Sequence, residues 1–229
     1  MLDRTWLGDA EALDFVSQAG VPIPPYGVAR SVSNAVHLAE ALPEPFVLKA
    51  ILPGVHHKSD ISGIRTDVAR ESVADAYGDL MDAIGRHAVG RTSDGVLVQS
   101  QVACGTEVIV GIQRDSAFGH VVLFGAGGLL SELVDDVSLR LAPLDRPAAR
   151  AMIEEARIYD VLRGARGQAV GHIGAVCDII LALSDLVERR PEVVELDLNP
   201  VIVHPEGAVA VDALVALHGV RAWQEPEEE

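Results

Sequence analysis

The chain has 229 residues, 49% of them hydrophobic, which is typical of a globular protein with one large domain or two small lobes. A net charge of −16 argues against a protein that binds nucleic acid, because such binding requires clustered positive charge. The most apolar run is too short to span a bilayer and no secretory leader is evident, so we expect no membrane association. With Cys104 and Cys177 as the two cysteines, a disulfide framework is not expected, which favours a cytoplasmic location.

Hydrophobic periodicity predicts helices and strands that interleave along the whole chain. The expected helices are 10–19, 33–42, 72–88, 147–158 and 170–189. The expected strands are 46–50, 61–68, 96–102, 107–113, 120–124, 137–141, 193–203 and 208–213. This order predicts a mixed α/β or α+β fold, in which a lobe of about residues 20–100 is separable from the rest.

The last two expected strands carry a polar face. Period-two alternation places Glu195, Asp197 and Asn199 on one side of the strand and apolar residues on the other. The His-Pro-Glu-Gly turn that follows predicts a symmetric hairpin with Asn199 opposite Asp212. Carboxylate and amide oxygens suit Mg²⁺. The alternative is a solvated polar face on an edge hairpin.

Two further features are typical of phosphate-binding sites. Lys49 ends an apolar strand, where its ammonium either contacts phosphate oxygens or simply extends to water. The run Gly125-Ala126-Gly127-Gly128 follows a strand, and the N–H groups of such a turn bind anions. No Gly-Lys-Ser/Thr follows it, so it is not a P-loop, and a plain turn is the alternative.

Two charged residues lie within expected strands. Arg140 stands between two leucines, and a half-buried guanidinium needs an anionic partner, either Asp135, Asp136 or a phosphate. Glu107 begins a strand, where its carboxylate either accepts ribose hydroxyls or pairs with a neighbour. An ammonium, an anion-binding turn, a guanidinium and a Mg²⁺ face are together the components of a phosphoryl-transfer site.

The order of these motifs resembles the ATP-grasp β subunit of ADP-forming acyl-CoA synthetases, the acetate–CoA ligases (ADP-forming) related to succinyl-CoA synthetase. The resemblance runs from the first helix to Asp212, and the ordered set is far more specific than any single motif. The matching segments are 47–49 (VLK), 57–60 (HKSD), 96–99 (VLVQ), 105–111 (GTEVIVG), 124–128 (FGAGG), 136–144 (DVSLRLAPL) and 195–200 (ELDLNP).

The resemblance implies an ATP-grasp fold, in which two lobes enclose a nucleotide. It implies an N-terminal helix and linker that pack on the second lobe (1–24), a small lobe (25–94), a large lobe (95–220) and an acidic tail (221–229). Segment 99–102 would lie along the adenine and Glu107 would hold the ribose. The implied nucleotide-binding residues are Lys49, Gln99, Ser100, Val102, Glu107, Gly125, Gly127 and Gly128. The implied Mg²⁺ ligands are Asn199, Asp212 and Asp197.

The implied catalytic residues are His57, Lys58 and Arg140. His57 resembles a transient phosphoryl acceptor, and neutral imidazole is a competent nucleophile because its pKa lies close to neutrality. Lys58 would neutralise the phosphorylated state, and Arg140 would face the transferred group. An ordinary loop histidine is the alternative, and His56 has no implied role.

The implied activity couples the interconversion of ATP and ADP to ligation of a carboxylate to CoA, with a CoA-binding α subunit as the partner in a heterotetramer. Two positions depart from the family pattern. Ser100 stands where the family usually has an acidic residue, and Ser62 stands where it often has glycine. A non-catalytic nucleotide-sensing module is a second interpretation, and Ser100 supports it. A ligase that joins a carboxylate to an amine is a third, and it would need no His57.

Overall fold

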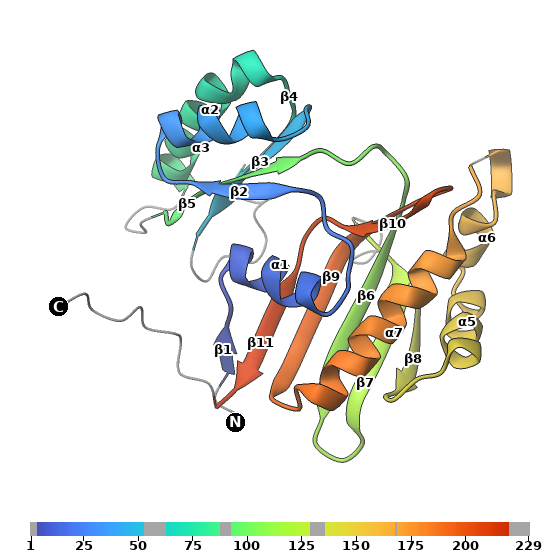
Figure 1. Cartoon of the computed structure of the whole chain (residues 1–229). Coiled ribbons are helices and arrows are strands. Elements are labelled where there is room, and N and C mark those ends of the chain that lie inside the picture. The colour runs from blue at the N-terminus through green and yellow to red at the C-terminus, as the bar shows by residue number, and fades with distance from the viewer. Residues whose placement is uncertain (1–3, 53–62, 88–92, 129–135, 168, 220–229) are drawn as a thin grey trace. The chain divides into compact units, whose positions relative to one another are not determined.

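A computed structural model describes residues 4–52, 63–87, 93–128, 136–167 and 169–219. Five residues named above lie outside the described residues: His56, His57, Lys58, Ser62 and Asp135. Contacts divide the chain into two compact units (Figure 1). The smaller unit comprises Gly8–Ala10 and Ile23–Ala103, and the larger unit comprises Met1–Leu7, Glu11–Pro22 and Cys104–Glu229.

The smaller unit is built on a four-stranded antiparallel sheet in the order β2-β5-β3-β4. Its strands are β2 (Tyr26–Ala29), β3 (Phe46–Ile51), β4 (Ile64–Val68) and β5 (Gly95–Ser100). Its helices are α2 (Val32–Ala41), the 3-10 turn η2 (Arg70–Ser72) and α3 (Val73–His87). Ser31 begins α2, because its Oγ accepts a hydrogen bond from Asn34 N at 3.2 Å.

Strand alternation gives this sheet two different faces. Phe46, Leu48, Val96 and Val98 are buried together with Leu80 of α3 in one apolar core. Each such side chain contributes roughly 1.5–3 kcal/mol when fully buried. The residues between them point to the opposite face of the sheet, which carries buried polar side chains as well as apolar ones.

The larger unit is built on a seven-stranded antiparallel sheet in the order β1-β11-β9-β6-β7-β8, with β10 paired to β9. Its strands are β1 (Arg4–Trp6), β6 (Thr106–Asp115), β7 (Gly119–Ala126), β8 (Val137–Leu141), β9 (Val193–His204), β10 (Gly207–Ala210) and β11 (Leu214–His218). Its helices are α1 (Asp9–Gln18), most of which belongs to this unit, α5 (Arg146–Glu155), α6 (Ile158–Leu162), the 3-10 turn η3 (Ala165–Gly167) and α7 (Ile173–Arg189).

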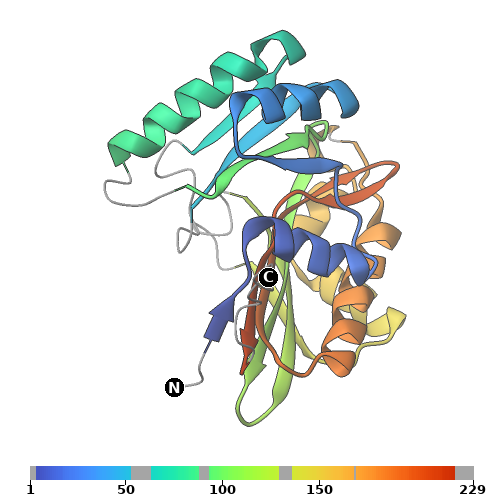
Figure 2. The same cartoon turned by 60° about the vertical axis from the view of Figure 1, so that its left-hand side comes forward.

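Helices α5 and α7 lie on one face of this sheet (Figure 2). Val110, Phe124 and Leu196 are fully or almost fully buried on that helix-covered face. The opposite face carries the residues between them, and we call it the carboxylate face. Its central residues are Ile109, Gly111 and Gln113 of β6, Val121 and Leu123 of β7, Leu139 of β8, and Glu195, Asp197 and Asn199 of β9.

Most of the expected elements are present, and the differences have local causes. The expected helix 147–158 is two helices, because the Asp136 carboxylate accepts hydrogen bonds from Arg157 N and Ile158 N at 2.7 and 2.9 Å and so begins α6. The expected strand 208–213 ends at residue 210, and β11 follows it as a separate strand. Strands β1 and β2 were not expected because they are only three and four residues long.

The contacts divide the chain a few residues after the expected boundary between the lobes, which lay at residues 94 and 95. β5 pairs with both β2 and β3, so the smaller unit continues to Ala103. Segment Glu11–Pro22 clusters with the larger unit, where the guanidinium of Arg190 lies 4.8 Å from the centroid of the Phe15 ring. Among the described residues, no helix is both long and apolar enough to cross a membrane.

Candidate functional site

The β9–β10 hairpin has the register that the sequence predicts. The backbone pairs run without a shift from a two-residue turn. The N–H of Val211 then donates to the carbonyl of Pro200 at 3.1 Å, which continues the same register past β10. Asp212 therefore follows opposite Asn199, at the end of the hairpin away from the turn.

A second contact joins Asn199 to the glycine run. The Asn199 Oδ1 accepts a hydrogen bond from Gly128 N at 2.9 Å. Gly128 has a φ of 61°, and a Cβ at this position would lie 1.8 Å from Glu107 Oε2. The Glu107 carboxylate and the Asn199 amide therefore both lie against Gly128, where the absence of a side chain leaves room for them. Three expected site residues meet at this point.

Asp197 lies near two other carboxylates. Burial, and then the charges of Glu195 and Asp212, raise the pKa of Asp197 to about 6. Its Oδ1 is buried and has no hydrogen-bond partner among the residues that the structure describes. Gly111 lies directly opposite in β6, and a Cβ there would be 3.9 Å from this oxygen. A buried carboxylate oxygen without a donor is costly, and a bound cation would remove that cost.

The donor set on this hairpin fits a divalent cation. Mg²⁺ prefers carboxylate and amide oxygens, and Asn199, Asp197 and Asp212 supply both kinds. Within the described ranges, no group of three or more His, Cys, Asp and Glu is arranged to hold a metal ion. The candidate site therefore depends on the Asn199 amide as well as on the carboxylates, and it leaves coordination positions for water and phosphate.

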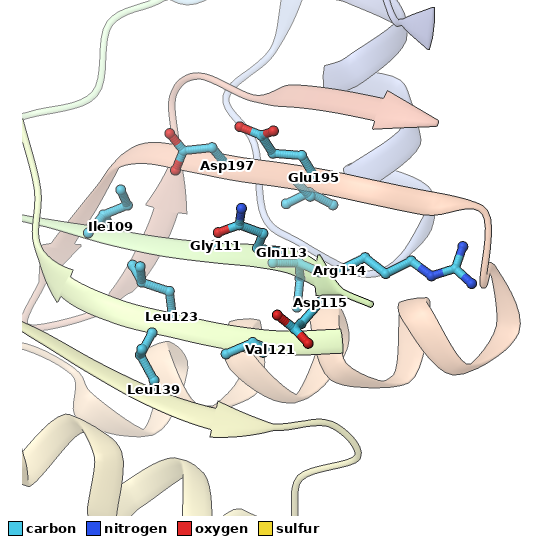
Figure 3. A pocket seen from close by; sticks show the side chains of 12 residues that line it. Ile109, Gly111, Gln113, Arg114, Asp115, Val121, Leu123, Leu139, Glu195 and Asp197 are labelled. Carbon is cyan, nitrogen blue, oxygen red and sulfur yellow. The ribbon is translucent and has the colours of Figure 1, made fainter. Parts of the chain in front are cut away.

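A groove of about 380 Å³ lies on the same carboxylate face (Figure 3). Glu195 and Asp197 of β9 line the groove, together with apolar side chains from β6, β7 and β8. These apolar residues are Ile109, Val121, Leu123 and Leu139. Gly111 also lines the groove, and it was not singled out from the sequence. A glycine within the run Val108-Ile109-Val110-Gly111-Ile112, whose other members are all β-branched, is the signal that would have identified it.

The backbone N–H groups of the glycine run already donate hydrogen bonds within the protein. The N–H groups of Ala126, Gly127 and Gly128 donate to protein acceptors at 3.3, 3.0 and 2.9 Å. A Cβ at Gly125 or Gly127 would lie 2.2 or 2.4 Å from a neighbouring backbone atom. The expectation of an anion cradle is therefore wrong for these three N–H groups. The glycines instead let neighbouring chain segments approach closely.

Arg140 does not face the candidate cation ligands. It lies opposite Val122 in the sheet, and Val122 is fully buried on the helix-covered face. Directly opposed residues of antiparallel strands share a face, so the Arg140 side chain extends towards α5, where it pairs with Glu155. The anionic partner is Glu155 and not the expected Asp136, whose carboxylate accepts hydrogen bonds from Arg157 N and Ile158 N. The catalytic role expected for Arg140 has no support in this arrangement.

In the smaller unit, Lys49 and Gln99 share the face opposite the apolar core. Lys49 pairs with Leu97 and Gln99 with Val47, so the two polar residues lie diagonally on neighbouring strands. Lys49 is 5% exposed and Gln99 is 1% exposed. Gln99 Nε2 is buried and has no hydrogen-bond partner in the described part of the chain. Such a donor is what a ligand with a hydrogen-bond acceptor would complete.

The other residues of the expected base-binding segment have different surroundings. The hydroxyl of Ser100 donates to Pro43 O at 2.8 Å, so this side chain is occupied within the protein. Val102 is partly buried in the loop that joins β5 to β6. Cys104, in the same loop, is exposed, whereas Cys177 is buried in α7, and neither forms a disulfide.

Comparison with known proteins gives the family. A family model described as an ATP-grasp domain matches residues 2–217. The chain is 35% identical over 212 residues to the β subunit of acetate–CoA ligase [ADP-forming] I of Pyrococcus furiosus, covering 92% of this chain and 91% of that one. It is 39% identical over 208 residues to acetate–CoA ligase [ADP-forming] I of Archaeoglobus fulgidus, but it spans only 30% of that relative's length.

Solved structures agree with this match. Acetyl-coenzyme A synthetase 1 of Ca. Korarchaeum cryptofilum, in complex with coenzyme A, Ca-AMPCP and HgCl+, has a TM-score of 0.90 at 37% identity, with 93% of both chains covered. A complex of that synthetase with coenzyme A and Mg-AMPPCP, whose phosphohistidine segment points towards the nucleotide binding site, has a TM-score of 0.81 at 36% identity and the same coverage. The expected fold and family are confirmed, and the ligase interpretation is favoured over the sensing module.

Proposed function

Because the chain belongs to the ATP-grasp family and to the β subunits of ADP-forming acetate–CoA ligases, we propose that it is the nucleotide-binding part of a carboxylate–CoA ligase. The overall reaction would be acyl-CoA + ADP + phosphate ⇌ carboxylate + CoA + ATP. The observation that carries the proposal is the β9–β10 hairpin, which brings Asn199, Asp197 and Asp212 together beside Glu107 and Gly128.

Each polar group would have a separate task in holding the nucleotide. Mg²⁺ bound by Asn199, Asp212 and Asp197 would supply positive charge to the phosphate oxygens. Lys49 would contact the phosphates from a rigid strand, and Glu107 would accept hydrogen bonds from the ribose hydroxyls. The remaining residues would complete the nucleotide site. Gln99 Nε2 would donate a hydrogen bond to the base. The backbone around the nucleotide would be shaped by Ser100, Val102, Gly125, Gly127 and Gly128.

The chemical step would be transfer of the γ-phosphoryl group to an imidazole nitrogen of His57. A P–O bond of ATP breaks, an N–P bond forms, and ADP leaves, with Lys58 neutralising charge on the phosphorylated loop. Support comes from the Korarchaeum structure, whose phosphohistidine segment points towards the nucleotide. The phosphoryl group would then pass to a CoA-binding α subunit in a heterotetramer. The separate β subunits of the Pyrococcus relatives support such a partner.

The test is to incubate the chain with γ-³²P-labelled ATP and Mg²⁺ and to map any acid-labile phosphate. We expect label on His57, loss of label in His57→Asn, and retention of label in His56→Asn, which is the matched control. Asn199→Ala should weaken binding of Mg-ATP by at least tenfold in calorimetry, because it removes one of the cation's few protein ligands. Tight Mg-ATP binding without phosphohistidine, even with the partner subunit present, would instead favour a nucleotide-sensing module.

A further inference from the structure

A reciprocal side-chain contact ties β4 to the segment after β5. Asp67 N donates to Gln101 Oε1 at 2.6 Å, and Gln101 Nε2 donates to Asp67 Oδ1 at 2.6 Å. We call this pair the Asp67–Gln101 clasp. The two strands are not neighbours, because β3 lies between them in the sheet. The clasp therefore reaches past β3 and joins residues 34 positions apart in the chain.

The backbone at Asp67 is bent to make this contact. Its φ is 55°, and it is the one residue other than glycine with a positive φ among the described residues. The pairing of β3 with β4 shifts register between Phe46 and Leu48, which leaves a bulge on the β4 side. A positive φ costs a residue with a side chain roughly 1–2 kcal/mol, although aspartate and asparagine tolerate it better than most. Something else in the fold must hold Asp67 in this conformation, and the two hydrogen bonds of the clasp do so.

The segment that the clasp holds is also fixed by its own backbone. Ser100 N donates to Pro25 O at 2.9 Å, and Gln101 N donates to Pro45 O at 2.8 Å. The hydroxyl of Ser100 donates to Pro43 O at 2.8 Å. The side chains of residues 100 and 101 are thus both used to fix the chain. Of Lys49 and residues 99–101, Gln99 is the one with a buried side-chain polar atom that has no hydrogen-bond partner among the described residues.

We propose that the Asp67–Gln101 clasp positions the base-binding segment, so that Gln99 and the backbone that follows it meet the nucleotide base without rearrangement. This inference rests on the proposed function, and it assigns Asp67 and Gln101 as positioning residues that do not touch the ligand. A pre-ordered segment loses less conformational freedom when the nucleotide binds, and affinity rises accordingly. The clasp should raise affinity only through contacts with the base, because the phosphates would be bound by other residues.

The test compares a ligand that has a base with one that lacks it. Affinities of Mg-ATP and of Mg-tripolyphosphate would be measured by displacement of a fluorescent ATP analogue, for the wild type and three variants. Gln101→Leu removes both hydrogen bonds and should weaken Mg-ATP about tenfold while changing Mg-tripolyphosphate less than twofold. Asp67→Gly keeps the backbone donor and should give a smaller loss, of about threefold. Asp67→Asn keeps both the acceptor and the tolerance of positive φ, so it should restore wild-type affinity.

Two results would refute the proposed role of the clasp while leaving the proposed function intact. One is wild-type affinity for Mg-ATP in Gln101→Leu. The other is an equal loss of affinity for both ligands, which would mean that the contact serves only the stability of the smaller unit. If the wild type itself fails to bind Mg-ATP, the proposed function falls, and the role of the clasp falls with it.

Discussion

Replacing Asp197 by asparagine should stabilise the cation-free protein at neutral pH. Burial, with the charges of Glu195 and Asp212, raises the pKa of Asp197 from an ordinary 3.8 to about 6. The folded protein therefore holds this proton more tightly than the unfolded chain. The stabilising contribution is complete below the unfolded pKa and is lost as pH rises through about 6. At ~1.4 kcal/mol for each pKa unit, the ionised carboxylate destabilises the fold by about 3 kcal/mol at most.

The assay is urea unfolding in EDTA, from pH 4.5 to pH 8, for the wild type and for Asp197→Asn. We expect the variant to be more stable by about 1–3 kcal/mol at pH 8 and the difference to shrink towards zero as the pH falls below 5. Glu195→Gln is the matched control. It removes a neighbouring charge but leaves the Asp197 carboxylate buried, so it should reproduce only a fraction of the effect. Its ion pair with Arg4 is exposed and contributes little.

Mg²⁺ gives the second half of this experiment. A cation that binds the ionised Asp197 should stabilise the wild type at pH 8 more than it stabilises Asp197→Asn, because binding to the folded state shifts unfolding by mass action. Parallel pH profiles for the wild type and the variant in EDTA would refute the reasoning. They would mean that water or a rearrangement relieves the buried charge without any ion.

Three other substitutions, one of them with a matched control, test contacts within the larger unit, each by urea unfolding. Gly127→Ala should lower the free energy of unfolding by at least about 2–3 kcal/mol, because the added Cβ would lie 2.4 Å from the backbone of β6. Gly119→Ala is the control: its φ is 82° and nothing lies within 4 Å of the added Cβ, so it should lower the free energy of unfolding by only about 1–2 kcal/mol. Asp136→Ala should cost about 1–2 kcal/mol, because it removes the two hydrogen bonds that begin α6. Ser184→Ala should cost about 1–3 kcal/mol, because it leaves the N–H of Leu144 without its acceptor at 2.8 Å.

The parts of the fold that could be predicted from the sequence are those determined by local patterns. Alternation and turn chemistry within one hairpin predicted that Asn199 lies opposite Asp212, and the observed register agrees with them. Helix α7 was predicted to within three residues, because its apolar stripe repeats along a single helix of 17 residues. In both cases the information lies within about 20 residues of the chain.

The parts that could not be predicted depend on contacts between distant segments. Arg140 needed an anion, as expected, but the partner that it found is Glu155, on a helix that packs on the same face of the sheet. No periodicity in the sequence specifies that a helix will cover this face. The Asp67–Gln101 clasp is similar, because it requires a bulge in β4 and a strand order in which β3 separates the two residues.

The carboxylate face carries a further argument about function. Local preferences in a natural sequence usually agree with the fold, and the exceptions concentrate where the protein acts. Asp197 is such an exception, since its Oδ1 is buried without a described partner beside two other carboxylates. Gln99 in the smaller unit is another exception, since its Nε2 is a buried donor that has no hydrogen-bond partner among the described residues. One exception is an acceptor that a cation would satisfy, and the other is a donor that a nucleotide base would satisfy.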